Sequence, residues 1–474
     1  MRRIHVLLLA LTLVAATSAP VVASTLGTTC KKVGITKLVK SSTYVCTKTG
    51  LKLSWQKMLK KKKQPRPVNQ EGQVEKVEKV SGRSESEVKA EAPQTPKKFP
   101  SVEISPDSLY LNAQLCKLNN KSGQTGVHQG FDQSPYVVNT RKTIRAAIVP
   151  IDFPDLVGGG NASTDFGYIT EGVSGYFSAI SDGKINFNWT IFPSYIRYSG
   201  KVSEARLAGT DTSGYNEFAS NAKKLARQTI DFKQFDLLIF APPLATTRSQ
   251  IAFGPAFLST SMDDINATML DGQSYDRRDV LFPSTTAHEI GHLMGLADLY
   301  NFSAREDVAS GREKSFDIAQ FKFMGGFDLM NHADGPGVEL TAWNRWLLGV
   351  LEDSQIRCLP QVATRTALTA VELEGGIKGA VIPISSSQVV VIESRKPIRY
   401  DRRLGVAGVL VYKVDTSIPS GSGPMTLIRK SGSVDALGID ALLREKESLI
   451  VGKVKISVLE TGTTGDVVEV SYLD

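Results

Sequence analysis

The sequence contains two histidines four residues apart, with a glutamate directly after the first. The types and spacing of these residues indicate a metal-binding catalytic site. The three residues are His288, Glu289 and His292. On a helix, residues four apart lie on one face, so the two imidazoles can bind one metal ion. Glu289 then lies beside that ion, where its carboxylate can act as a base toward water rather than as a third ligand. The spacing therefore predicts a catalytic zinc site for metal-assisted hydrolysis.

A catalytic zinc site of this kind needs one more protein ligand and one open position for water. Gly295 follows the second histidine, and glycine most easily adopts the left-handed conformation that ends a helix. The chain can then turn back and present Asp298 as the third ligand. We therefore predict Zn²⁺ as the cofactor, held by His288, His292 and Asp298. A structural Ca²⁺ ion is a further possible cofactor, but the sequence does not assign ligands to it.

The pattern HExxHxxGxx followed by a third ligand is the zinc motif of metzincin peptidases, here with Asp298 where most members have histidine. Metzincins also carry a methionine turn beneath the zinc site. Residues 327–331 (FDLMN) contain Met330 at a suitable distance and are expected to form this Met330 turn. In some metzincins a tyrosine two residues after the methionine stabilises the transition state. His332 has that position here and is a second candidate catalytic residue, as a donor to the developing oxyanion. Tyr300, two residues after Asp298, could reach the cleft, but it is expected to pack.

The chain resembles the immune inhibitor A family of secreted bacterial metalloproteases. Besides the zinc motif, segments that resemble the family's first strand, first helix, methionine turn and downstream β region follow in the family's order. These are residues 148–155, 173–177 with 182–185, 327–330 with 342–349, and 391–395 with 408–415. The resemblance implies a secreted endopeptidase with His288, His292 and Asp298 as zinc ligands and Glu289 as the base.

The first 23 residues have the features of a secretory signal peptide. Arg2 and Arg3 give a basic start, a short apolar run follows, and small residues end at Ala23. A membrane anchor is the alternative, but the apolar run is too short to span a bilayer comfortably. We predict cleavage after Ala23 and a secreted or cell-surface location.

Positive charge is concentrated in the segment that follows. The formal net charge is +8, but residues 24–63 hold eleven lysines and no Asp or Glu, whereas residues 64–474 hold 43 basic and 48 acidic residues. We interpret residues 24–58 as a small basic module and residues 59–100 as a disordered linker, from its Lys, Glu, Pro, Ser and Gln content. The module either adheres to an anionic cell-wall polymer or membrane surface, or is a solvated spacer. Nucleic acid is not an expected partner of an exported chain.

Four cysteines are expected to form two disulfides, because paired cysteines in an exported chain indicate oxidation. One pair is Cys30 with Cys46, which would stabilise the basic module. The other is Cys116 with Cys358, which would join the beginning of the catalytic domain to its end. The alternative for the second pair is that one thiol stays free.

The expected fold is an α/β metzincin-like catalytic domain over residues 101–360, followed by a β-rich module over residues 361–474. Ser284 or Thr285 is expected to cap the zinc helix. The strand at residues 251–258 is expected at the sheet edge, where an extended substrate can pair with it. The other expected strands lie at 144–153, 185–198, 235–240, 389–393, 408–412, 453–459 and 467–472, and the expected helices at 172–180 and 215–230.

The leading interpretation is a secreted zinc endopeptidase that acts on protein or peptide substrates. One alternative is a cell-surface binding protein in which the protease-like domain is only a scaffold. The complete set of ligands and base argues against this alternative. A third interpretation keeps the zinc but makes the substrate a peptide cross-link of the cell wall.

Overall fold

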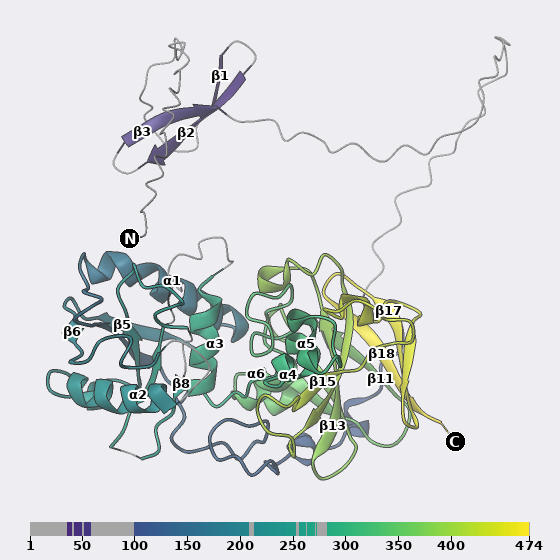
Figure 1. Ribbon diagram of the computed structural model, residues 1–474. Coiled ribbons are helices and arrows are strands. Elements are labelled where there is room, and N and C mark those ends of the chain that lie inside the picture. Colours follow the sequence, from purple (N-terminus) through teal and green to yellow (C-terminus); the bar gives the residue numbers. More distant parts are fainter. Residues whose placement is uncertain are drawn as a thin grey trace, which may run out of the picture. The chain divides into compact units, whose positions relative to one another are not determined.

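The computed structural model describes residues 36–39, 42–49, 52–57, 99–207, 213–252, 256–261, 263–270, 272 and 282–473. The chain divides into two units, Met1–Ala90 and Glu91–Asp474, which are described separately (Figure 1). The predicted signal peptide and most of the predicted linker lie outside the described residues, and so does Cys30 of the predicted Cys30–Cys46 disulfide. None of the helices in the described ranges is long and apolar enough to cross a membrane.

The first unit contains a three-stranded antiparallel sheet in which the central strand pairs with both neighbours. The strands are β1 (Thr36–Val39), β2 (Ser42–Thr49) and β3 (Lys52–Lys57). Threonine, valine, tyrosine and tryptophan, which favour strands, are frequent in these segments. The backbone register places Cys46 opposite Trp55. The predicted basic module therefore contains regular β-structure.

The second unit is a mixed α/β structure, as the sequence predicts, and its first sheet has the order β5-β4-β7-β9-β8, with β6 also paired to β4. All pairings are parallel except that of β8, which runs antiparallel at the edge. The strands are β4 (Ile144–Asp152), β5 (Phe187–Ile191), β6 (Ile196–Arg197), β7 (Leu237–Ala241), β8 (Ala256–Phe257) and β9 (Asn266–Met269).

Both faces of this sheet are covered by helices (Figure 1). Alternate residues of β4 show this, because successive strand side chains point to opposite faces. Ala147 and Val149 pack in one core cluster with helix α2 (Ser213–Ala226). Ala146 and Ile148 pack in another with helices α1 (Ala162–Ile180) and α3 (Ser284–Leu293). The β4 segment is nearly all apolar because it is buried on both sides.

The C-terminal part contains two further sheets, with the orders β10-β12-β13-β14-β15 and β11-β18-β17-β16. Their facing side chains form one apolar cluster, while the other face of the five-stranded sheet shares the core of α1 and α3. The predicted boundary at residue 360 stays a prediction. The strands are β10 (Ile356–Cys358), β11 (Thr364–Thr369), β12 (Gly379–Pro383), β13 (Gln388–Arg395), β14 (Gly408–Asp415), β15 (Met425–Leu427), β16 (Ser448–Val451), β17 (Val454–Thr461) and β18 (Gly465–Tyr472).

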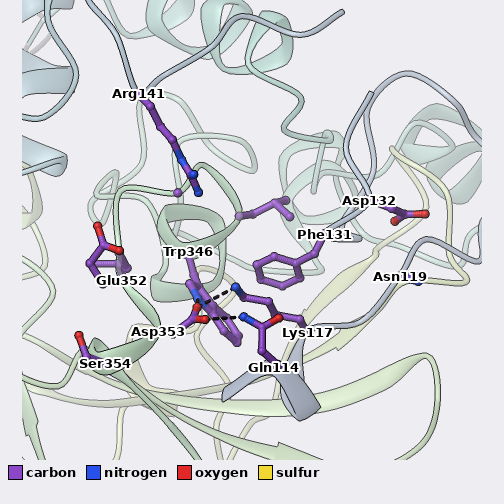
Figure 2. Close-up of a pocket in the computed structure, with 13 residues that line it drawn as sticks. Gln114, Lys117, Asn119, Phe131, Asp132, Arg141, Trp346, Glu352, Asp353 and Ser354 are labelled. Atoms are coloured by element: carbon purple, nitrogen blue, oxygen red, sulfur yellow. Dashed lines mark hydrogen bonds and ion pairs between the residues drawn. The ribbon is translucent and has the colours of Figure 1, made fainter. Parts of the chain in front are cut away.

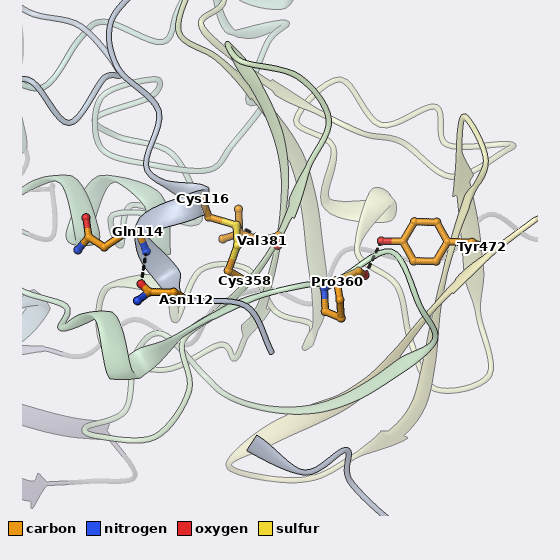
Figure 3. The surroundings of a disulfide bond; sticks show 7 residues. All are labelled: Asn112, Gln114, Cys116, Cys358, Pro360, Val381 and Tyr472. Carbon is orange, nitrogen blue, oxygen red and sulfur yellow. Dashed lines mark hydrogen bonds between the residues drawn. A yellow bond between two sulfur atoms is a disulfide. The ribbon is translucent and has the colours of Figure 1, made fainter. Parts of the chain in front are cut away.

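Three short helices lie between α3 and these sheets: α4 (Ala304–Ala309), α5 (Phe316–Phe321) and α6 (Ala342–Leu347). Residues 111–138, which we call the arm, precede β4. The predicted disulfide between Cys116 and Cys358 is confirmed and attaches the arm to β10 (Figure 3). Leu111 and Cys358 also form an isolated antiparallel bridge.

Several elements differ from the sequence prediction, among them α1 and the strands before α3. Helix α1 begins ten residues earlier than the predicted start at residue 172, because Asn161 caps it by accepting a hydrogen bond from the Thr164 amide at 3.2 Å. Within the predicted strand 251–258, only β8 is a strand in the described residues. The strand that precedes α3 is β9, which the prediction missed because it is short and half polar. Its burial between β7 and β8 supplies its stability.

A cluster of buried charges lies between the helices and the five-stranded sheet. Arg395 is fully buried, with its Nε 3.1 Å from Glu393 Oε1 and its Nη1 3.1 Å from Asp401 Oδ2. Glu339 and Glu372 are also fully buried nearby. Burial raises the pKa of Asp401 well above its usual value, and the Glu372 and Glu339 carboxylates raise it further against the effect of Arg395. Burial likewise raises the pKa of Glu372.

This cluster predicts that its own contribution to stability falls as the pH rises above the usual carboxyl pKa of about 4. A carboxyl group with a raised pKa in the folded state binds its proton more tightly there than in the unfolded chain. Its stabilising contribution is therefore complete below about pH 4 and disappears as the pH rises through the folded pKa. The size of this loss depends on how far the pKa of the group differs between the two states. Each pKa unit of difference corresponds to about 1.4 kcal/mol of unfolding free energy.

The substitution Glu372→Gln imitates the protonated form, so we expect a flatter dependence of unfolding free energy on pH than in the wild type. Urea unfolding at pH values from about 5 to 9 measures this. Glu374→Gln, at an exposed position two residues away, is the matched control and should keep the wild-type dependence. Parallel profiles for the wild type and Glu372→Gln would contradict the assignment.

Candidate metal centre

Helix α3 carries both histidines, and two backbone carbonyls from outside the helix orient their rings. His288 Nδ1 lies 2.9 Å from the carbonyl oxygen of Leu329, and His292 Nδ1 lies 2.7 Å from that of Leu296. A ring whose Nδ1–H donates to a carbonyl keeps Nε2 as the free lone pair, which is the arrangement of metal-binding histidines. The ring centroids are 4.8 Å apart and nearly perpendicular. Both Nε2 atoms are thereby available to one ion.

Gly295 ends this helix as predicted. It has φ +100°, and the Leu296 amide donates back to the Gly291 carbonyl at 3.0 Å, which is the glycine-based helix end. A side chain at position 295 would also collide with Gln133 of the arm. The turn then brings Asp298 to the histidines.

Asp298 completes a set of three possible metal ligands. Its Oδ1 lies 3.1 Å from Nε2 of His288 and 3.1 Å from Nε2 of His292. Ligand atoms of these three residues all lie within 4.8 Å of one another, and all three residues are buried. Two imidazole nitrogens and one carboxylate oxygen are a donor set that suits catalytic Zn²⁺ with a fourth position for water. In the described part of the chain, no other group of His, Cys, Asp and Glu side chains converges in this way.

Electrostatics tie the three side chains together. Burial alone would raise the pKa of Asp298, yet the two histidines hold it well below its usual value. Burial disfavours the charged form of His292, but the Asp298 carboxylate and the Leu296 carbonyl outweigh this and raise its pKa. The carboxylate is therefore ionised at neutral pH and could serve as a negative ligand.

The Met330 turn packs against α3, while its role as a metzincin methionine turn stays a prediction. The Met330 sulfur lies 2.6 Å from where a Cβ would stand on Gly291, so a larger residue there would require the Met330 side chain to move. Leu299, next to Asp298, donates its amide to the Met330 carbonyl at 3.0 Å. The turn thus contacts α3 at Gly291. Its Leu329 carbonyl orients the His288 ring, and its Met330 carbonyl holds the segment that carries Asp298.

Asp328 maintains the shape of this turn, although the sequence did not identify it as a site residue. Its backbone has φ +69°, and its fully buried carboxylate accepts hydrogen bonds from the Met330 and Thr341 amides at 2.9 and 2.8 Å. Asn344 of α6 donates to the same carboxylate at 2.9 Å. The signal that could have revealed it is an acidic residue inside the FDLM segment, because a carboxylate is expensive to bury without such partners.

Glu289 and Tyr300 lie beside the three ligands. Glu289 follows His288 on α3 and is half-buried, whereas both of its chain neighbours are buried. Tyr300, also half-buried, has its ring centroid 6.1 Å from that of His288. Burial, with added effects of Asp298 and Glu289, holds the pKa of Tyr300 well above its usual value. Its phenol therefore keeps its proton at neutral pH, and its ring also packs near Phe302, with ring centroids 5.4 Å apart.

His332 lies in a different environment. Its ring stacks on Phe321 with centroids 3.8 Å apart. Burial lowers its pKa, and the charged groups that oppose this are Asp334 and Asp317. These neighbours belong to α5 and to the segment after the Met330 turn, and they are not ligands of the candidate metal centre. The role of His332 as an oxyanion donor stays a prediction.

The predicted cap of the zinc helix is wrong. Pro283 has the N-cap position and no side chain caps the helix. Ser284 instead donates its hydroxyl to Asp334 at 2.7 Å, which links the start of α3 to the segment after the Met330 turn. This partner is distant in sequence, so local spacing did not reveal it.

Two pockets are lined in part by residues of the arm. One, of ≈ 920 Å³, is polar and is lined by residues of the arm and by residues at and after the end of α6, with Lys117 2.7 Å from Asp353 (Figure 2). The other, of ≈ 530 Å³, is lined by arm residues and by Leu258, Ser259 and Thr260, which follow edge strand β8. The second pocket is better placed for a chain bound along β8.

No family model and no curated protein matches the chain. The interpretation of the site therefore depends on its donor set, on its burial and on the support from the Met330 turn.

Proposed function

We propose that this chain is a secreted zinc-dependent endopeptidase of the metzincin type. The observation that carries the proposal is the convergence of His288, His292 and Asp298 in a buried site, with Glu289 directly beside the first ligand. The parallel sheet with an antiparallel edge strand and the Met330 turn under α3 also support it. The secretory part of the proposal rests on the sequence of residues 1–23 alone.

Zinc, when bound, would supply Lewis-acid activation of water and of the scissile carbonyl. Glu289 would take a proton from the attacking water and pass it to the leaving amine. The Leu329 and Leu296 carbonyls keep both histidine rings fixed throughout. Tyr300, whose ring centroid lies 6.1 Å from that of His288, would be a donor to the developing oxyanion, and His332 stays the alternative.

An extended substrate would pair with the outer edge of β8, because that edge has no further strand in the described sheet. Main-chain hydrogen bonds would then align the substrate beside the metal centre. The pocket of ≈ 530 Å³ that follows β8 would accept a substrate side chain.

Digestion of casein by the full-length protein tests this proposal. We expect cleavage that a zinc chelator abolishes and that zinc added in equimolar amount restores. Cleavage that persists after complete removal of metal would refute the metal mechanism. Clearing of purified cell wall without casein cleavage would favour the wall-peptide hydrolase, and zinc binding without either activity would favour the surface-binding scaffold.

A further inference from the structure

The loop between β14 and β15 (residues 416–424) contacts the candidate metal centre from the C-terminal β-rich part of the chain. The Asp298 amide donates to Ser420 Oγ at 2.9 Å, and the Gly421 amide donates to the Asp298 carbonyl at 2.9 Å. Phe302 then donates its amide to the Gly421 carbonyl at 2.9 Å. These bonds fix the backbone on both sides of the third ligand.

Ser420 also faces the Asp298 side chain. Its Oγ lies 3.5 Å from Asp298 Oδ2, whereas Oδ1 of the same carboxylate faces the two histidines. Both residues are buried, so water does not readily replace this contact. The serine hydroxyl therefore lies next to Oδ2, and the other carboxylate oxygen, Oδ1, is the one directed at the histidines.

The arm holds this loop in turn. The Ser420 amide donates to Gln124 Oε1 at 2.7 Å, and the Lys121 amide donates to the Thr416 carbonyl at 2.9 Å. Thr416 Oγ1 donates to the Asn119 carbonyl at 2.8 Å. The disulfide at Cys116 anchors the same arm. Ser420 is thus fixed from a second side.

We propose that Ser420 is a positioning residue that orients Asp298 for metal binding, so that the C-terminal β-rich part contributes directly to the metal centre. This inference rests on the proposed zinc site. Hydrogen-bond partners of metal ligands fix ligand orientation, and their removal typically lowers metal affinity by about 10–100-fold. Ser420 would act in this way although it lies 122 residues from Asp298.

The test is the zinc dissociation constant of the full-length protein, measured by competition with a chromophoric chelator. We expect Ser420→Ala to bind zinc about 10–100-fold more weakly than the wild type. Ser420→Thr, which keeps the hydroxyl, should bind close to the wild type. Ser422→Ala, at an exposed serine of the same loop, is the matched control and should bind as the wild type does.

A merely structural role would lower the unfolding temperature of the metal-free and zinc-loaded forms equally. A positioning role reduces the extra stability that zinc gives, because that stability depends on the dissociation constant. Wild-type affinity in folded Ser420→Ala overturns the inference. If that variant does not fold, Gln124→Ala replaces it, with weaker zinc binding expected and unchanged binding overturning the inference. A wild type that binds no zinc would instead overturn the proposed function.

Discussion

We expect Glu289→Gln to lower the rate of casein cleavage by a factor on the order of 10²–10⁴, the usual contribution of a general base, while zinc stays bound. Glutamine has nearly the same shape as glutamate but cannot accept a proton from water. Glu289 is half-buried beside His288, and Asp298 rather than Glu289 completes the ligand set. The substitution should therefore separate proton transfer from metal binding.

Zinc content and cleavage rate are measured on the same folded sample of Glu289→Gln. Glu306→Gln, at an exposed glutamate of α4, is the matched control and should keep both values. Loss of zinc from folded Glu289→Gln would mean that Glu289 is a ligand. Undiminished cleavage would mean that another group is the base.

Asp298→Ala should differ from Glu289→Gln, because its primary effect should be the loss of zinc and not the loss of proton transfer. Removing one of three protein ligands should weaken binding by more than the ~10–100-fold expected for a hydrogen-bond partner such as Ser420. It also leaves His288 and His292 without the carboxylate that lies 3.1 Å from both Nε2 atoms. Chelator competition measures the affinity, and cleavage at excess zinc shows how much activity returns.

Asp334→Ala is a suitable control for Asp298→Ala. Asp334 is another acidic residue near α3, but it contacts that helix at Ser284, its first residue, rather than at the histidines. This variant should bind zinc as the wild type does. Zinc affinity that is unchanged in Asp298→Ala would require a different third ligand.

The local part of the site could be predicted from the sequence. His288 and His292 share a helix face because of their spacing, and Gly295 has the left-handed conformation that the turn requires. The Cys116–Cys358 disulfide was also predictable, because few cysteines are available to pair. These features depend on neighbouring residues or on very few alternatives.

The support around the site could not be predicted in this way. Ser420 and Asp328 act through partners that the fold, and not the spacing, brings together. The four-residue strand β9 owes its existence to burial between two other strands. His332 shows that a position in the sequence does not determine the environment of a side chain. It lies two residues after Met330, where the metzincin pattern predicts a catalytic donor, but its ring stacks on Phe321.

The Cys116–Cys358 disulfide joins residues separated by 242 positions, and the interval includes the parallel sheet, α3 and the Met330 turn. A single cut anywhere in this interval leaves two fragments that remain one covalent molecule. An enzyme that nicks itself there would migrate at full mass on a denaturing gel without reductant and separate into two bands only after reduction. Cuts inside this interval can therefore be counted only on reduced samples.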